Sequence, residues 1–202
     1  ATDWTTYDTI TIESDNVDDD LTDFPVFVDL SDLSSDFWST IASGGTDIRV
    51  TTDTSPAEVP REVVFASTTL QTGELHFKGD ISSTTDTSFR IYYNGTTTDD
   101  YARAATFGAE RVWSNDFLGV WHFNQDPTGA VPQMRDSSSY RRHGNMIGTT
   151  TAADTISGQV GTALSLDGES YIEIADFSIV SGASTTMSFW LNDDDLSETS
   201  YV

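Results

Sequence analysis

Short stretches in which apolar and polar residues alternate recur along the first half of the chain. In "TYDTITIE", residues 6–13, Tyr7, Ile10 and Ile12 stand among polar residues, as in a strand with one buried face. Gly, Pro, Asp, Ser and Thr separate such stretches, as turns require. Further strands are predicted at five ranges, residues 24–30, 47–53, 61–67, 73–79 and 88–94. One short helix is predicted at residues 34–42, where Ser or Asp can cap the first turn.

A second group of predicted strands follows residue 110. Its members occupy four ranges, residues 118–123, 162–168, 170–175 and 185–192. Many short strands separated by turn signals are typical of antiparallel β-sandwiches. We therefore predict an all-β chain of two antiparallel β-sandwich domains, residues 1–109 and residues 110–202, divided in the weakly patterned stretch around residue 110.

The second group resembles the concanavalin A-like, laminin-G-like family of jelly-roll domains. In that family a strand similar to "GVWHF" (119–123) leads into a loop with an Asp-Ser-Ser-Gly-Asn-x-x-His-Gly signature. The stretch "DSSSYRRHG" agrees with this signature at five positions, Asp136, Ser137, Ser138, His143 and Gly144. It departs at Ser139 and Tyr140, where Gly and Asn are usual. Because residues 158–174 and 185–192 are similar to two further stretches of the family, the resemblance implies a concanavalin A-like jelly roll.

Residues 1–109 resemble a domain family of unknown function that is often found directly upstream of such jelly rolls. The resemblance lies in four stretches, "LTDFPVFVDL" (21–30), "GGTDIRVT" (44–51), "VPREVV" (59–64) and "SFRIYYNGT" (88–96). The order of the two domains along the chain supports both resemblances.

The jelly-roll resemblance implies a calcium site near the loops of the second domain. Calcium takes several oxygen ligands at once, and the candidate ligands are Asp136, Asp167 and Glu169. An alternative for Asp136 is a turn carboxylate that accepts hydrogen bonds from nearby backbone N–H groups. Calcium is the only cofactor that we expect.

The loop at residues 135–145 also concentrates positive charge, because three of the nine Lys and Arg residues lie in it. Tyr140, Arg141 and Arg142 are candidate ligand-binding residues, since guanidinium groups pair with carboxylates and aromatic rings stack on apolar sugar faces. The alternative is local charge balance within a very acidic domain. His143 is expected to be a structural hydrogen-bonding residue.

The sequence offers little support for catalysis. His76 and His122 lie in separate predicted strands, and neither has a second histidine at a metal-binding spacing. The chain has no Cys, which excludes disulfides and thiolate metal sites. It has no Gly-x-Ser-x-Gly elbow, no His-Glu-x-x-His helix and no phosphate-binding Gly loop. Since carboxylate pairs are too abundant here to identify a glycosidase, we expect no enzymatic activity.

The net charge of −24 restricts the classes of partner. Nucleic-acid phosphates attract Lys and Arg, so we expect no nucleic-acid binding. The same charge argues against docking on anionic lipid. No apolar run approaches the ~20 residues that span a bilayer, so we expect no membrane insertion.

These observations, with the resemblance, favour a surface protein for adhesion or recognition whose partner is a glycan or a glycosylated receptor. We expect it on a virion, as a tail fibre or spike, or at the surface of a cell in a high-salt environment. The missing cysteine and secretion signal favour the virion. The alternative is a purely structural virion or appendage subunit, such as a decoration, spike or fibre protein, that binds other protein chains.

The predicted jelly roll contains fewer strands than its resemblance to the family leads us to expect. A partial sandwich would leave an apolar face and a strand edge uncovered. We therefore expect the second domain either to continue beyond residue 202 or to be completed by a partner subunit, as a homo-oligomer or within a larger assembly.

The charge composition predicts a strong response of stability to salt. Lys78 is the only lysine, and the acids are mostly Asp. A net charge of −24 should destabilise the compact state through self-repulsion. We predict that the melting temperature rises steeply with sodium or potassium chloride, from tens of millimolar into the molar range. A melting temperature that is flat above about 0.3 M, where the Debye length is already below about 8 Å, would contradict adaptation to high salt.

Overall fold

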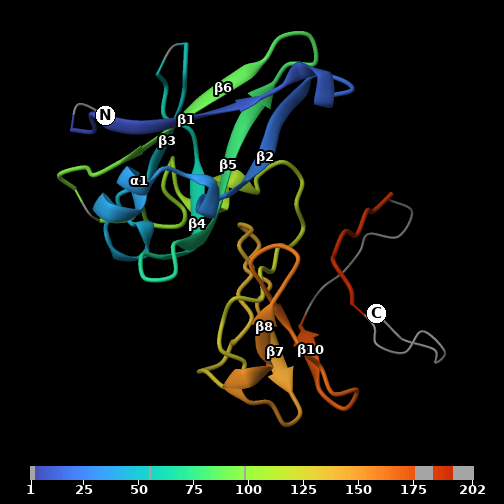
Figure 1. The fold of residues 1–202 in the computed structure, drawn as a ribbon. Helices are drawn as coiled ribbons and strands as arrows, with labels where there is room; N and C mark the ends of the chain where they lie inside the picture. Colours follow the sequence, from blue (N-terminus) through green and yellow to red (C-terminus); the bar gives the residue numbers. More distant parts are fainter. Residues whose placement is uncertain (1–2, 55, 98, 176–183, 193–202) are drawn as a thin grey trace.

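The computed structural model describes residues 3–54, 56–97, 99–175 and 184–192 (Figure 1). Regular structure within these ranges is mainly antiparallel β-sheet with a few short helices. The predicted all-β class is therefore confirmed at this level. The finer arrangement, two β-sandwich domains divided near residue 110 with a jelly roll as the second, stays a prediction.

The first sheet has three antiparallel strands in the order β1 (Thr6–Ile12), β6 (Thr87–Tyr93) and β3 (Arg49–Thr52). In β1 every second residue is partly buried, and Ile10 and Ile12 lie on this face as predicted. Tyr7 lies on the opposite face and is 41% exposed, so its predicted place on the buried face was wrong. The central strand β6 places Phe89 and Ile91 in the core, at 1% and 0% exposure.

The second sheet has the order β2 (Leu21–Asp29), β5 (Thr72–Ile81) and β4 (Arg61–Ser67), again antiparallel. The central strand β5 is buried along most of its length on both of its faces. One face carries Leu75 and Phe77, which are fully buried in the hydrophobic core. Because side chains alternate along a strand, Glu74 and His76 point to the opposite face.

One hydrophobic core joins the two sheets. Thirteen buried side chains form it, Val26, Leu30, Phe37, Trp38, Ile41, Ile48, Val50, Leu75, Phe77, Ile81, Phe89, Ile91 and Tyr93. Helix α1 (Ser35–Thr40) contributes its two aromatic residues, and its N-cap Ser34 accepts a hydrogen bond from the backbone N–H of Phe37. The predicted helix at residues 34–42 is thus confirmed as a shorter element.

The remaining helical elements are short. They are α2 (Ala109–Val112) and four 3-10 helices, η1 (Ser14–Asn16), η2 (Leu30–Asp32), η3 (Ser43–Gly45) and η4 (Ala152–Asp154). Within the described ranges, no helix has the length and apolar character needed to cross a membrane.

The described residues of the second half of the chain form two small antiparallel pairs. Strand β7 (Gly144–Ile147) pairs with β10 (Tyr171–Ile174), and β8 (Thr155–Ser157) pairs with β9 (Thr162–Leu164). Figure 1 draws β7, β8 and β10 in orange and red, below the sheets of the first half. Strands β9 and β10 fall within predicted strands, whereas β7 and β8 do not.

Two predicted strands are not formed. Residues 118–123 make only an isolated bridge between Trp121 and Asp136, because the neighbouring segment is a loop, and the backbone N–H of Val120 donates to the side chain of Asp136 instead of to a strand. Residues 185–192 have no regular structure, and their apolar side chains are exposed. The prediction of strands at these two ranges was wrong.

A matched pair of phenylalanines tests the core of the second sheet. Phe77 is fully buried, whereas Phe24, on the neighbouring strand β2, is 42% exposed. We predict that Phe77→Ala lowers the free energy of unfolding by about 3–5 kcal/mol, because it leaves a cavity. Phe24→Ala should lower it by less than about 1.5 kcal/mol. Denaturant unfolding measures both, and equal losses would place Phe77 outside the core.

Candidate functional site

The outer face of the second sheet carries a cluster of buried polar side chains. Strand β4 supplies Glu62 and strand β5 supplies Glu74 and His76, which share a face because they are two residues apart. Glu62 lies opposite His76 in the β4–β5 register. The second half of the chain adds His122 and Trp113. The exposed fraction is 6% for Glu62, 2% for Glu74 and 8% for His76, so the second half covers this face.

His122 bridges the two carboxylates of this cluster. Its Nε2 lies 3.3 Å from Oε2 of Glu62, and its Nδ1 lies 3.1 Å from Oε1 of Glu74. The same Oε1 atom is 2.8 Å from Nε2 of His76. One carboxylate oxygen of Glu74 therefore contacts two imidazoles that come from segments 46 residues apart in the sequence.

Glu62 is fixed by two further donors. The indole Nε1 of Trp113 donates to its Oε2 at 2.5 Å, and the hydroxyl of Ser137 donates to its Oε1 at 2.6 Å. The rings of Trp113, His76 and His122 lie against one another, with centroids 5.1 to 5.7 Å apart. Packing and hydrogen bonding together hold the cluster in one arrangement.

The charges in the cluster depend on one another. Burial alone would lower the pKa of His122, but its contacts with Glu62 and Glu74 raise that pKa to about 9. Burial alone would raise the pKa of Glu74, but His122 and His76 lower it to about 2. The pKa of Glu62 is likewise below its usual value because His122, Ser137 and Trp113 outweigh its burial. At neutral pH, His122 is therefore an imidazolium between two carboxylates.

Asp136, the first predicted calcium ligand, is fully buried and fixes the loop that contains it. Its Oδ1 accepts hydrogen bonds from the backbone N–H groups of Val120 and Ser138. Its Oδ2 accepts from the hydroxyl of Ser138 and from the backbone N–H of Arg142. His143 supports the same loop, since its Nδ1 accepts from the backbone N–H of Asp136 at 3.0 Å. These contacts are those of the turn carboxylate considered above.

The other two predicted calcium ligands lie in the turn before β10. Asp167 accepts hydrogen bonds from the backbone N–H groups of Glu169 and Ser170, which lower its pKa. This turn precedes the Tyr171 end of the β7–β10 pair, whereas Asp136 lies beside its Gly144 end. The structure therefore does not bring Asp136 together with Asp167 and Glu169, and calcium binding stays a prediction.

The predicted ligand-binding residues lie together on the same loop. The guanidinium carbon of Arg142 lies 4.5 Å from the ring centroid of Tyr140, which is 54% exposed. Arg142 also donates through Nη1 to the backbone carbonyl of Leu118 at 2.7 Å. Arg141 donates through Nε to Glu110 at 2.8 Å, a contact that raises its pKa. Part of the positive charge is thus used in local charge balance, and the partly buried Arg142 stacks on the exposed ring of Tyr140.

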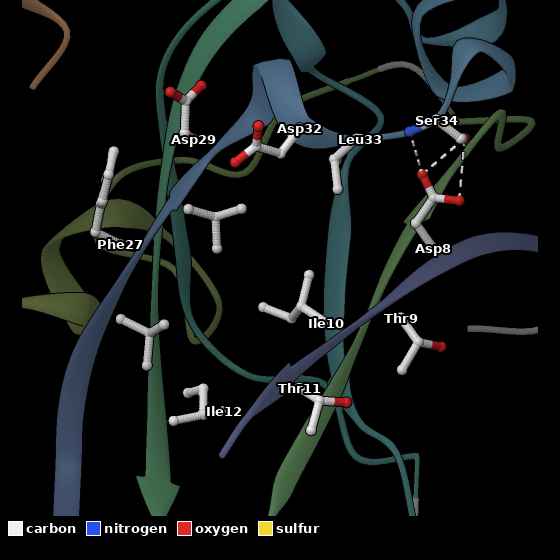
Figure 2. A pocket seen from close by; sticks show the side chains of 12 residues that line it. Asp8, Thr9, Ile10, Thr11, Ile12, Phe27, Asp29, Asp32, Leu33 and Ser34 are labelled. Carbon is white, nitrogen blue, oxygen red and sulfur yellow. Dashed lines mark hydrogen bonds between the residues drawn. The ribbon is translucent and has the colours of Figure 1, made fainter. Parts of the chain in front are cut away.

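A groove of about 470 Å³ lies between β1 and β2, the edge strands of the two sheets (Figure 2). Ile10, Ile12 and Leu33 line it and pack against the hydrophobic core. On its rim, Asp8 accepts hydrogen bonds from the backbone N–H and the hydroxyl of Ser34. The lining contains no histidine and no basic residue. The groove therefore offers two strand edges and an apolar floor, and its lining includes the carboxylates of Asp8, Asp29 and Asp32.

The buried cluster was missed in the sequence because its members are far apart in the chain. The expectation of no histidine metal site considered only spacing along the chain, whereas the fold brings His76 and His122 within 5.1 Å of each other, centroid to centroid. One usable signal was present. Glu74 and His76 alternate with apolar residues in a strand whose two faces are both buried, so polar partners had to come from another segment.

We predict that this cluster sets the pH range over which the folded chain is stable. Stability is to be measured in the presence of a chelator, so that no metal ion contributes. The stabilising contribution of His122 is complete below about pH 6.5, its ordinary pKa, and is lost as pH rises through about 9. The contribution of Glu74 is complete above its ordinary pKa of 4.5 and is lost as pH falls towards about 2. In thermal melts of the His122→Gln variant, the melting temperature should no longer fall as pH rises through about 9. An unchanged alkaline limb in this variant would refute the assignment.

Comparison of the chain with protein-family models, with curated proteins and with solved structures found no match. The family resemblances seen in the sequence therefore stay predictions. Any function has to be argued from the geometry of the residues described above.

Proposed function

We propose that this chain is a non-catalytic recognition protein that binds a glycan or a glycosylated receptor through the loop at residues 135–145. The observation that carries the proposal is the stacked pair of Tyr140 and Arg142, which is presented on a loop fixed by the fully buried Asp136.

The chemistry of this pair suits a saccharide. An exposed aromatic face covers the apolar face of a sugar ring, and a planar guanidinium donates hydrogen bonds to hydroxyl or carboxylate oxygens. The stacking of Arg142 on Tyr140 places both functions on one surface. In a chain with a net charge of −24, such a surface is also one of the few that an acidic sugar can approach.

The loop needs little reorganisation to bind. Asp136 accepts four hydrogen bonds from within the loop and from residue 120, and Arg142 is tied to the carbonyl of Leu118. Binding to an ordered surface avoids much of the entropy that a flexible loop would lose. This order therefore supports recognition by the loop.

The setting that we propose follows from the same features and from the resemblance. The chain would consist of two antiparallel β-sandwich domains, the second a jelly roll, displayed on a virion or cell surface in high salt. The acidic composition supports the high-salt setting. Calcium would be held by the loops of the second domain.

A second function, that of a structural subunit binding other protein chains, is favoured by a different observation. Four large apolar side chains in the segment 184–192 are exposed, Met187 at 68%, Phe189 at 52%, Trp190 at 76% and Leu191 at 61%. Figure 1 draws this segment apart from β7 and β10. Exposed apolar side chains gathered in one segment mark protein contacts, and an incoming strand could also pair with the open edges of β1 and β2.

A glycan array, followed by titration of the best saccharide, tests the first function. We predict that Tyr140→Ala weakens saccharide binding about tenfold, because it removes the stacking face. Tyr171→Ala is the matched control, since Tyr171 is 53% exposed but lies at the far end of β7 and β10. The Tyr171→Ala variant should bind the saccharide with the same affinity as the unmodified chain. Absence of any saccharide preference would overturn the proposal and favour the structural subunit.

A further inference from the structure

We infer that Glu74, His76 and His122 form a binding site for a divalent transition-metal ion of the zinc class. Each residue offers one ligand atom, and the three atoms lie within 4.8 Å of one another. No other group of three His, Asp or Glu side chains in the described part of the chain meets this criterion. The inference goes beyond the proposed recognition function and does not rest on it.

The distances are close to those of a tetrahedral site. Oε1 of Glu74 lies 2.8 Å from Nε2 of His76 and 3.1 Å from Nδ1 of His122. Ligand atoms bound to one zinc ion at about 2.0–2.1 Å lie roughly 3.3 Å apart. Binding of an ion therefore needs the carboxylate oxygen to move away from each imidazole nitrogen by only a few tenths of an ångström, and the two nitrogens already lie within 4.8 Å of each other.

The donor set selects the class of metal. Two imidazole nitrogens and one carboxylate oxygen suit zinc and its neighbours in the first transition row. Calcium and magnesium prefer sites made entirely of oxygen atoms. The proposed site is thus distinct in chemistry from the calcium site predicted at Asp136, Asp167 and Glu169.

The surroundings of the ligands are those of a built metal site. The second ring nitrogen of His122 contacts Glu62, which receives hydrogen bonds from Trp113 and Ser137. Histidine ligands commonly make such a contact with a carboxylate through the nitrogen that does not hold the metal, and it sets the ring orientation. Glu62 is accordingly a positioning residue and not a ligand.

The charge balance also favours a divalent ion. Glu62 and Glu74 bring two negative charges into a region where both are at most 6% exposed. A divalent cation with two neutral imidazoles would neutralise them, and buried charges are stable only when they are paired or bind a metal. The ion would then connect strand β5 with the segment at residues 118–123.

The site is largely enclosed, and a tetrahedral ion held by its three protein ligands would take water as the fourth ligand. Gly161 approaches Oε2 of Glu74 so closely that a Cβ atom at this position would collide with the carboxylate. Its backbone has φ +58°, a conformation that favours glycine. The turn that contains Gly161 therefore closes over the carboxylate, and a bound ion would fasten the second half of the chain to the sheet.

Titration of the chelator-treated chain with zinc tests the inference. Millimolar calcium should be present throughout, because 33 Asp and Glu residues bind divalent cations weakly. We expect one equivalent of zinc to bind in calorimetry and to raise the melting temperature. Cobalt, used as a spectroscopic substitute, should give the absorption bands of a tetrahedral ion. No stoichiometric binding of zinc would overturn the inference.

Variants and resonance assignments locate the ion. His76→Gln should lower the zinc affinity at least 100-fold, and Glu62→Gln should lower it 10- to 100-fold. His143→Gln, at the third histidine of the chain, should leave it unchanged. If a variant fails to fold, nuclear magnetic resonance of the unmodified chain decides. Zinc should shift the imidazole signals of His76 and His122 and leave those of His143 in place, whereas binding without these shifts would indicate surface carboxylates only.

Discussion

The burial of two carboxylates on one face of the β4–β5 pair is the constraint on which the arrangement of the whole chain depends. Glu62 and Glu74 are too enclosed to be solvated by water, so a cation has to lie between them. His122 supplies it from the second half of the chain. Removing one partner of a buried ion pair typically costs about 3–5 kcal/mol. The buried outer face of the second sheet therefore depends on the segment that carries His122.

The same constraint explains how a chain with a net charge of −24 uses its few cations. Among the described residues, six of the nine Lys and Arg side chains form ion pairs with carboxylates, Arg49, Arg61, Lys78, Arg90, Arg103 and Arg141. Two of them, Arg49 of β3 and Arg61 of β4, are 2% exposed and stack on the ring of Tyr101, so they hold the segment around Tyr101 against a strand of each sheet. Much of the positive charge is thus placed where segments meet, while Arg111, Arg135 and Arg141 stay exposed.

Local pattern was sufficient to predict the strands of the two three-stranded sheets, although it missed β7 and β8 in the second half of the chain. Strand β4 occupies the predicted residues 61–67, and β1 and β6 agree with their predictions within one residue at each end. The prediction failed at residues 118–123, because their partners are side chains and a loop instead of a strand. The cluster could not be derived from spacing, since His76 and His122 meet only through the fold. What the sequence did contain was a strand with polar residues on a buried face, which requires a distant partner without identifying it.

The buried cluster and the exposed loop form one connected network. Glu62, which orients His122, also accepts a hydrogen bond from Ser137, the neighbour of Asp136. Asp136 in turn holds the backbone of Arg142, whose guanidinium stacks on Tyr140. Hydrogen bonds in a region of low dielectric reinforce one another, and they also make each missing partner costly. The exposed ring of Tyr140 is therefore connected to the buried carboxylate of Glu62 through Ser137, Asp136 and Arg142. An ion bound among His76, His122 and Glu74 would stiffen the same surface that we propose for recognition.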